Sequence, residues 1–130
     1  MSRQKIKFGT DGWRAVIAED FTFANVDRVA QATAEHWERC RPKRTRKKVV
    51  VGYDRRFLAD QFAERVAEVF AGNGFEVVLG DSPTPTPAIS FAVKAEKAVG
   101  GIVFTASHNP AAFCGYKLKG HFGGSADSET

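Results

Sequence analysis

A short segment near the end of the sequence gathers side chains that are suited to phosphoryl transfer. Residues 105–110 read Thr-Ala-Ser-His-Asn-Pro, so a hydroxyl (Ser107), an imidazole (His108) and an amide (Asn109) follow one another. The proline at the end of this segment biases Asn109 away from helical dihedral angles, which favours an open turn. The segment is therefore a candidate catalytic loop.

Two cationic residues could serve the same loop. Lys117 follows Ser107 at a distance of ten residues, and Arg14 closes the glycine-containing segment 9–14. Proteins that transfer a phosphoryl group mainly position the reactants and neutralise phosphate charge. Arginine, lysine and histidine around a serine fit that requirement, so these residue types favour phosphate chemistry.

Two other interpretations of Ser107 remain open at this level. Acyl transfer needs an oriented base and an oxyanion hole, and the Gly-x-Ser-x-Gly elbow that often provides them is absent around Ser107. The serine could also simply cap an ordinary turn. The residues alone favour phosphate chemistry over acyl transfer and leave the capping interpretation standing.

The hydrophobic pattern predicts one α/β domain over residues 1–130. Short β-branched or apolar runs alternate with amphipathic stretches and short connections, which favours a parallel sheet with right-handed crossovers. We expect a three-layer α/β/α domain with a mainly parallel sheet and an antiparallel edge strand at 116–119. The expected strands are 48–54, 75–79 and 100–106, and the expected helices are 57–74, 86–97 and one that begins at Thr22.

Helix-end signals support these boundaries. Thr22 and Thr86 are suitable N-cap residues, and Pro87 suits a first helical position. The Gly-Asn-Gly sequence at 72–74 is typical of a helix C-terminus. The apolar faces expected to be buried are Val26, Ala30, Thr33 and Trp37 in the first helix and Phe62, Val66, Val69 and Phe70 in the second.

In open α/β sheets, ligands bind beyond the carboxyl ends of the strands. The segments that leave those ends are 54–56, 80–82 and 106–110, and the last carries the most chemistry. We expect Asp54 and Arg55 to tie the end of their strand to neighbouring loops.

Charge and cysteine content exclude several classes of protein. Seven of the ten residues 39–48 are basic, and without them the other basic residues number twelve against fifteen acidic ones. We interpret this run as an exposed connector, and nucleic-acid binding is not favoured because no aromatic residues interleave it. No apolar stretch approaches a membrane span. Cys40 and Cys114 show no metal-ligand spacing, so a cytoplasmic, reducing location is expected.

Five motifs of the chain resemble the α-D-phosphohexomutases, the family of phosphoglucomutase, phosphomannomutase and phosphoglucosamine mutase. The motifs occur in family order over essentially the whole chain: Phe-Gly-Thr-Asp-Gly-Trp-Arg (8–14), Val-Gly-Tyr-Asp-Arg-Arg (51–56), Thr-Pro-Thr-Pro (84–87), Thr-Ala-Ser-His-Asn-Pro (105–110) and Gly-Tyr-Lys (115–117). The resemblance is to the first of four domains and argues against the capping interpretation of Ser107.

The resemblance implies an activity and its cofactors. Members of the family exchange phosphate between the 1- and 6-positions of a hexose phosphate through a phosphoserine, here Ser107. A phosphoserine carries about −1.5 to −2 charges near neutral pH, so cations and a metal must offset it. The family uses Mg²⁺ bound to that phosphate, with the other ligands on a later domain, and an activator of the glucose 1,6-bisphosphate type.

The resemblance also implies residue roles. Lys117 would act as a general acid/base and phosphate partner, Arg14 would stabilise the transferring group, and His108 would contact the reacting end of the substrate. Thr105 and Asn109 are expected to contribute to phosphate binding. The expected partners are a hexose phosphate and the remaining domains of the same enzyme.

The chain departs from the family in one residue and in length. Cys114 stands where asparagine commonly precedes Gly-Tyr-Lys, and no segment matches the metal loop or the sugar-selecting loop. We therefore expect the 130 residues to be inactive alone. The alternative is a stand-alone module that binds a phosphate or phosphosugar without catalysis.

Overall fold

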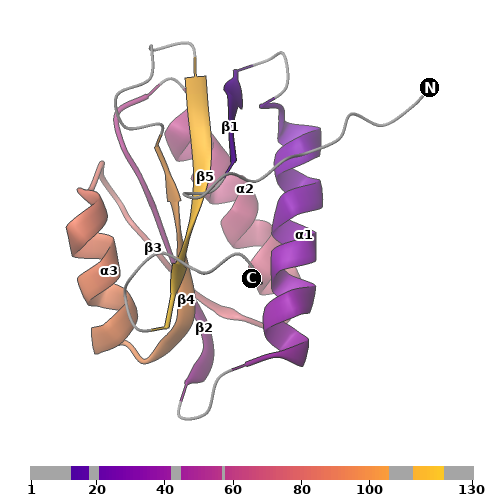
Figure 1. Ribbon diagram of the computed structural model, residues 1–130, viewed down its shortest axis with the longest axis vertical. Helices are drawn as coiled ribbons and strands as arrows, with labels where there is room; N and C mark the ends of the chain where they lie inside the picture. The colour runs from indigo at the N-terminus through magenta and orange to yellow at the C-terminus, as the bar shows by residue number, and fades with distance from the viewer. Residues whose placement is uncertain (1–12, 18–20, 42–44, 57, 106–112, 122–130) are drawn as a thin grey trace.

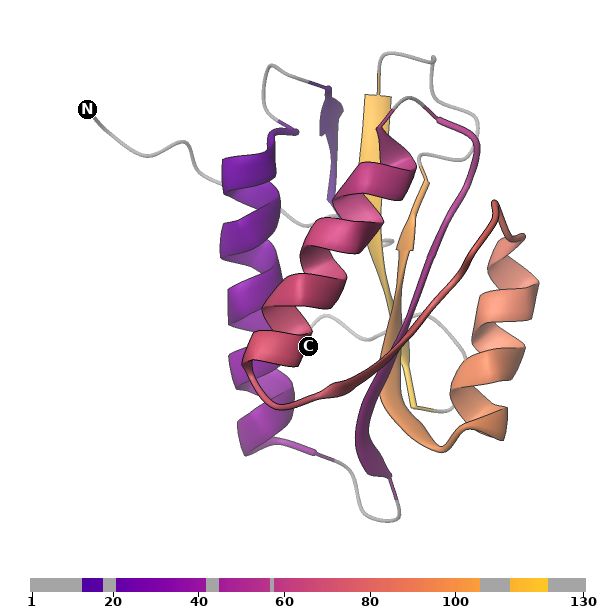
Figure 2. The same cartoon turned by 180° about the vertical axis from the view of Figure 1, so that it is seen from behind.

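The computed structural model describes residues 13–17, 21–41, 45–56, 58–105 and 113–121. Within these residues it contains three helices and five strands. In chain order they are β1 (Trp13–Val16), α1 (Phe23–Arg39), β2 (Arg46–Tyr53), α2 (Ala59–Gly72), β3 (Glu76–Leu79), α3 (Thr86–Ala95), β4 (Ala98–Phe104) and β5 (Phe113–Gly120). Figures 1 and 2 show α1 and α2 side by side on one face of the sheet and α3 on the other. The expected three-layer α/β/α architecture is confirmed.

The sheet is mixed, with strand order β1-β5-β4-β2-β3. β2 runs parallel to β3 and β4, whereas β5 runs antiparallel to both β4 and β1. The prediction of an edge position for the strand at 116–119 is wrong. The segment Trp13–Val16, for which the sequence predicts no strand, pairs with the outer side of β5 and takes the edge.

Each face of the sheet has its own apolar core, because alternate side chains of a strand point to opposite faces. The larger core lies under α1 and α2 and includes a chain of aromatic rings. Trp13 stacks on Phe21 at a centroid distance of 4.4 Å, and Phe104 meets Tyr116 edge-on at 5.5 Å. The smaller core lies under α3 and consists of Val50, Ile89, Val93, Ala98 and Val103. These two cores hold the sheet rigid between the helical layers.

The helix ends follow the sequence signals at two of three places. Thr22 is the N-cap of α1, where its hydroxyl oxygen accepts the backbone N–H of Asn25 at 3.2 Å. Asn73 is the C-cap of α2, and Gly74 follows it with a φ of 84°. At α3 the expected boundary is wrong by one residue, because Pro85 occupies the N-cap and Thr86 is already helical. The predicted buried faces of α1 and α2 are confirmed, with Val69 half-buried against the core.

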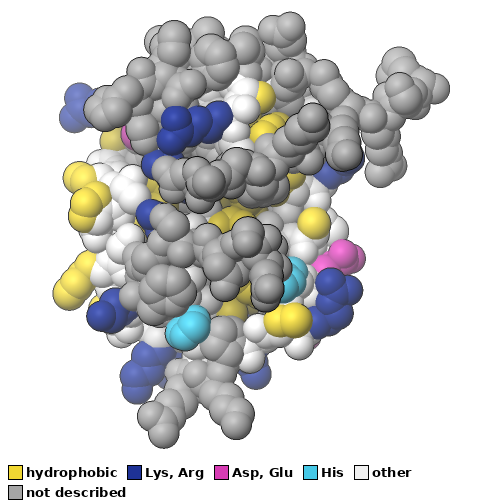
Figure 3. Space-filling view, viewed as in Figure 1, with side chains coloured by type: hydrophobic (Ala, Val, Ile, Leu, Met, Phe, Trp, Pro, Cys, Tyr) yellow, Lys and Arg dark blue, Asp and Glu magenta, His cyan; other side chains and the backbone are white. Residues whose placement is uncertain are grey.

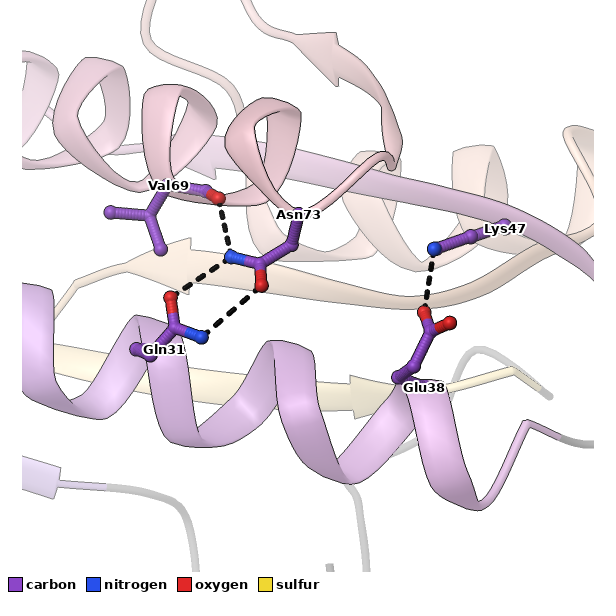
Figure 4. Close-up of polar contacts among 5 residues, drawn as sticks. All are labelled: Gln31, Glu38, Lys47, Val69 and Asn73. Carbon is purple, nitrogen blue, oxygen red and sulfur yellow. Dashed lines mark hydrogen bonds and ion pairs between the residues drawn. The ribbon is translucent and has the colours of Figure 1, made fainter.

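Side-chain contacts tie α1 to the elements beside it (Figure 4). The amides of Gln31 and Asn73 exchange two hydrogen bonds, at 2.9 and 3.1 Å, and Asn73 also donates to the carbonyl of Val69. Nearer the end of the helix, Glu38 pairs with Lys47 of β2 at 2.6 Å. Both contacts hold the end of α2 and the start of β2 against the same helix.

The interpretation of residues 39–48 as a uniformly exposed connector is wrong at its C-terminal end. β2 begins at Arg46, and Lys48 is only 7% exposed. Its ammonium donates to Glu96 at 2.9 Å and lies 3.9 Å from Glu76. Part of the basic run therefore contributes ion pairs to the fold, because a buried charge needs a partner.

Among the described residues, no helix is both long enough and apolar enough to cross a membrane.

Candidate functional site

The predicted site residues divide between described and undescribed parts of the chain. Arg14 lies in β1, Lys117 lies in β5, and Thr105 directly follows β4. Ser107, His108 and Asn109 lie outside the described residues. The site can therefore be built from the strands that surround the carboxyl end of β4.

Three adjacent strands bring Arg14 and Thr105 to the same level of the sheet. Arg14 is paired with Gly115 across the β1–β5 ladder. On the other side of β5, the backbone N–H of Thr105 donates to the carbonyl of Gly115 at 3.0 Å. Gly115 therefore stands between Arg14 and Thr105, and all three lie at the carboxyl end of β4.

Lys117 shares one face of the sheet with Arg14. Lys117 is two residues beyond Gly115, and residues i and i+2 of a strand point to the same face. Directly opposed residues of an antiparallel pair also share a face, so Arg14 belongs with Gly115 and Lys117 on the α3 side. In such a diagonal arrangement the Cα atoms of Arg14 and Lys117 stand about 7–8 Å apart. The register thus places the two cations diagonally on the same face of the sheet.

The two cations differ in their exposure. The side chain of Arg14 is exposed, whereas Lys117 is 7% exposed and lies opposite Val103 of the α3-side core. An ammonium is costly to bury unless it is paired or hydrogen-bonded. Lys117 is therefore a largely buried cation, whereas the side chain of Arg14 is accessible to solvent.

The loop after β2 braces the same edge of the sheet. The backbone N–H of Asp54 donates to the carbonyl of Phe104 at 3.0 Å, which links the ends of β2 and β4. The Asp54 carboxylate accepts the backbone N–H of Arg56 at 2.9 Å, and Arg56 Nε lies 3.4 Å from its second oxygen. Asp54 therefore ties the strand end as expected, but Arg56 does so in place of Arg55, whose side chain is exposed.

The loop after β3 contacts the end of β2 through its backbone. The N–H of Gly80 donates to the carbonyl of Val51 at 3.0 Å, and that of Thr84 donates to the carbonyl of Tyr53 at 2.9 Å. The side chains of Asp81 and Ser82 are exposed. This loop therefore borders the carboxyl ends of the parallel strands on the side of β3.

The other face of β5 is neutral beneath the cations. Burial raises the pKa of the Cys114 thiol to about 12, although a hydrogen bond from the Gly115 backbone to the sulfur lowers it in part. Burial likewise raises the pKa of the Tyr116 phenol well above its usual range. Both groups stay protonated at neutral pH, so Cys114 is not a nucleophile at this site.

The described residues do not supply a metal centre. Within them there is no group of three or more histidine, cysteine, aspartate or glutamate side chains that could hold a metal ion. Mg²⁺ prefers several oxygen ligands in octahedral geometry, whereas Arg14 and Lys117 are cationic and the Asp54 carboxylate at this edge is already held by Arg56. The donor set of this part of the chain does not fit Mg²⁺, so no chemical step is derived through a metal.

Figure 3 shows Lys and Arg side chains at the upper end of the molecule, where β1 and β5 meet the carboxyl end of β4, and others at the lower end. Arg14 of β1, whose side chain is exposed, belongs to this end of the sheet. A site of this kind suits an anion.

A family model described as "Phosphoglucomutase/phosphomannomutase, alpha/beta/alpha domain I" matches residues 5–130. The chain belongs to this family. The resemblance found in the sequence motifs is thereby confirmed at the level of the family and its first domain. The residues matched by the phosphoglucomutase/phosphomannomutase family model include both Arg14 and Lys117.

Curated relatives of the chain are much longer than it is. A Schizosaccharomyces pombe protein with the name "Probable phosphoribomutase" is 40% identical over 117 residues, which is 88% of this chain but 20% of that protein. A phosphoglucomutase of Staphylococcus saprophyticus is 41% identical over 76 residues, 58% of this chain and 14% of that enzyme. The chain thus spans about a fifth or less of the length of these relatives.

Solved structures agree with the fold. A Thermus thermophilus protein assigned as a phosphomannomutase superposes with a TM-score of 0.88 at 49% identity, covering 95% of this chain and 28% of that one. A phosphoglucomutase/phosphomannomutase family protein of Burkholderia thailandensis superposes with a TM-score of 0.75 at 21% identity, over 90% of this chain and 26% of that one. The second likeness concerns the fold alone.

Two residues of the site were not singled out from the sequence. Gly115 was noted only as part of a motif, and its position between Arg14 and Thr105 depends on strand pairings that join distant segments. Arg56 contacts Asp54 at the end of β2, where the sequence analysis expected Arg55. The spacing of Asp54 and Arg56 by two residues was the available signal, since aspartate side chains often accept the backbone N–H two residues on.

Proposed function

We propose that this chain is the domain of a sugar-phosphate mutase that carries the transferring phosphoryl group on Ser107. The observation that carries the proposal is the pair of cations, Arg14 and Lys117, on one face of the sheet beside the end of β4. Thr105, at that end, precedes Ser107 by two residues. A phosphoserine in this neighbourhood would find the positive charge that it requires.

The proposed reaction moves phosphate between the 1- and 6-positions of a hexose phosphate. In the first transfer, the bond between phosphorus and Ser107 Oγ breaks and a bond from phosphorus to a sugar hydroxyl oxygen forms. The sugar hydroxyl loses its proton and the serine oxygen gains one. A second transfer from the other phosphate of the bisphosphorylated sugar restores the phosphoserine, so an activator of the glucose 1,6-bisphosphate type would prime the serine.

Each residue has a defined part in this proposal. Arg14 would offset the charge that develops on the equatorial oxygens of the phosphoryl group, as cationic clamps do in phosphoryl transfer. Lys117 would hold a phosphate oxygen and exchange the proton of the serine oxygen. Thr105 and Asn109 would help to bind phosphate, and His108 would contact the reacting end of the sugar.

The proposal assigns other elements of the reaction to the rest of a longer enzyme. Mg²⁺ would associate with the Ser107 phosphate, and its other ligands would lie outside the residues described here. We therefore propose that the 130 residues alone do not turn over substrate. Cys40 and Cys114 are free thiols, which suits a cytoplasmic location.

The sugar is proposed only as a class. The curated relatives carry the names of ribose and glucose mutases, and the Thermus protein carries that of a mannose mutase. All of these names describe aldose phosphates, and the cation pair recognises the phosphate rather than the sugar. A hexose phosphate is the substrate that we propose first.

Phosphate titration followed by ¹H–¹⁵N NMR tests the cation pair. Inorganic phosphate should shift the amides of Gly115 and Thr105, and Arg14→Ala should weaken binding by about tenfold or more, since hydrogen bonds to charged groups contribute roughly 1.5–3 kcal/mol. The matched control is Arg41→Ala, an exposed arginine just beyond the C-terminal end of α1. Equal weakening by both substitutions, or shifts confined to other parts of the sheet, would remove the site.

A further inference from the structure

The Cγ atom of Arg14 lies against Gly115. A Cβ atom built on Gly115 would stand 3.0 Å from Cγ of Arg14 and 3.2 Å from the carbonyl oxygen of Trp13, and it would come closer still to the carbonyl oxygen of Thr105. Contacts below 3.0 Å to a backbone atom require the backbone to shift, and a neighbour at 3.0 Å must also give way. No side chain fits at this position without displacing Arg14 or the end of β4.

Backbone conformation does not account for this glycine. Among the described glycines, Gly74 alone has a positive φ. Gly115 lies in a regular antiparallel ladder between β1 and β4, where an ordinary residue adopts the same dihedral angles. What the position requires is space, because the carbonyl oxygen of Thr105 and Cγ of Arg14 both lie where a Cβ atom would stand.

The path across Gly115 gives Arg14 a direction. Gly115 separates Arg14 from Thr105, so a side chain that leaves β1 and passes over Gly115 heads toward the end of β4. With a residue other than glycine at position 115, the long arginine side chain would have to turn aside into solvent. An arginine held along one path also loses less conformational entropy when it binds a ligand.

We propose that Gly115 is a positioning residue for Arg14: the missing side chain opens a channel over β5 through which Arg14 reaches the phosphoryl group. This inference rests on the proposed function only for what Arg14 reaches. The contact between Arg14 and Gly115 does not depend on the proposed function. The experiments below therefore measure this contact and phosphate binding separately.

The first measurement needs no substitution. NMR should detect nuclear Overhauser effects between the α-protons of Gly115 and the side-chain methylene protons of Arg14. The ¹⁵Nε relaxation of Arg14 should also show a more ordered side chain than that of the exposed Arg41. A missing Overhauser effect together with a mobile Arg14 side chain would overturn the proposal, whatever the protein binds.

The second measurement is a double-mutant cycle on phosphate affinity. We expect Gly115→Ala to raise the dissociation constant for inorganic phosphate by about fivefold or more when Arg14 is present, and by less than about twofold in the Arg14→Ala background. Equal losses in both backgrounds would overturn the proposal, because Gly115 would then act through the strand rather than through Arg14. If Arg14→Ala itself leaves phosphate binding unchanged, the proposed function fails, and the Overhauser measurement still decides whether Arg14 contacts Gly115.

Gly100→Ala is the matched control. A Cβ atom there would also strike the neighbouring strand, at 2.6 Å from the carbonyl oxygen of Lys119, and it would meet Trp37 at 2.5 Å. Gly100 pairs with Gly120 at the opposite end of β5 from Arg14. This variant should lose thermal stability to an extent like that of Gly115→Ala while its phosphate affinity changes by less than about twofold. A comparable loss of affinity in the control would overturn the proposal.

Discussion

The hydroxyl of Tyr116 donates a hydrogen bond to Oγ1 of Thr33 at 3.0 Å, and both side chains are buried. Thr33 in turn donates to the carbonyl of Val29 at 2.7 Å. Because burial raises the pKa of the Tyr116 phenol, the O–H remains available as a donor at any ordinary pH. This chain of two bonds fastens β5 to α1, one residue away from Lys117.

Removing either end of the Tyr116–Thr33 bond should have unequal effects. Tyr116→Phe deletes the donor and should lower the free energy of unfolding by about 1 kcal/mol. Thr33→Val leaves a buried phenol without its acceptor and should cost more, roughly 1–3 kcal/mol. Urea unfolding measures both variants, and the double variant should cost less than the sum. A milder effect for Thr33→Val than for Tyr116→Phe would contradict this account of the bond.

Two glycines at the end of α2 should respond to alanine in opposite directions. Gly72 is the last residue of the helix and has nothing within 4 Å of a built Cβ, so Gly72→Ala should stabilise the protein by about 0.5–1 kcal/mol. Gly74 has a φ of 84° and would place its Cβ 3.2 Å from Lys47 Nζ, so Gly74→Ala should destabilise by about 1–2 kcal/mol. Thermal unfolding compares the pair, and changes of the same sign would refute the assignment of the helix end.

The ion pair of Lys48 and Glu96 should make stability depend on pH in the acid range. The hydrogen bond and charge of Lys48 lower the pKa of Glu96 below its ordinary value of 4.5. The unfolded chain therefore binds this proton more readily than the folded one, so the stabilisation is present above about pH 4.5 and is lost as the pH falls through the lowered pKa.

Glu96→Gln should consequently flatten the loss of stability between about pH 5 and pH 3. The matched control is Glu64→Gln, since Glu64 is exposed on α2 and makes no ion pair with any residue that the structure describes. Urea midpoints across the pH series measure the difference. Identical pH profiles for the two variants would show that the Lys48–Glu96 ion pair does not cause the pH dependence of stability.

The two cysteines should differ sharply in reactivity. The pKa of Cys114 is raised to about 12 by burial, and the side chain is inaccessible, whereas Cys40 is exposed. Iodoacetamide at about pH 8 should therefore alkylate Cys40 in the folded protein and Cys114 only after unfolding, because the thiolate is the nucleophile. Mass spectrometry of the Cys40→Ser variant isolates the second thiol. Rapid alkylation of Cys114 in that folded variant would contradict its burial.

The sequence was sufficient to predict the strands and helices of the parallel part of the sheet. β2 and β4 are buried on both faces and so appear as continuous apolar runs, and the period of α1 and α2 identifies their buried sides. β1 could not be predicted from the sequence because it has four residues, one of them the charged Arg14. A strand this short has no periodicity of its own, and its existence depends on pairing with β5.

The arrangement of the site was out of reach of sequence patterns for the same reason. That Arg14 and Lys117 share a face follows from the pairing of Trp13 with Tyr116, and a shift of one residue would put the two cations on opposite faces. Residue types and motif spacing indicated which side chains to examine. The register between segments about a hundred residues apart decided which of them meet.

Phosphopeptide mapping tests the central claim most directly. The chain and its Ser107→Ala variant are incubated with glucose 1,6-bisphosphate and Mg²⁺, and their intact masses and tryptic peptides are then compared, with Arg14→Ala as a third sample. We expect one added phosphoryl group on Ser107 in the unchanged chain, none in Ser107→Ala and a reduced yield in Arg14→Ala. A phosphoryl group on another residue, or an unmodified Ser107 in a chain that still binds phosphate at Arg14 and Lys117, would contradict the mutase proposal and favour a binding module without catalysis.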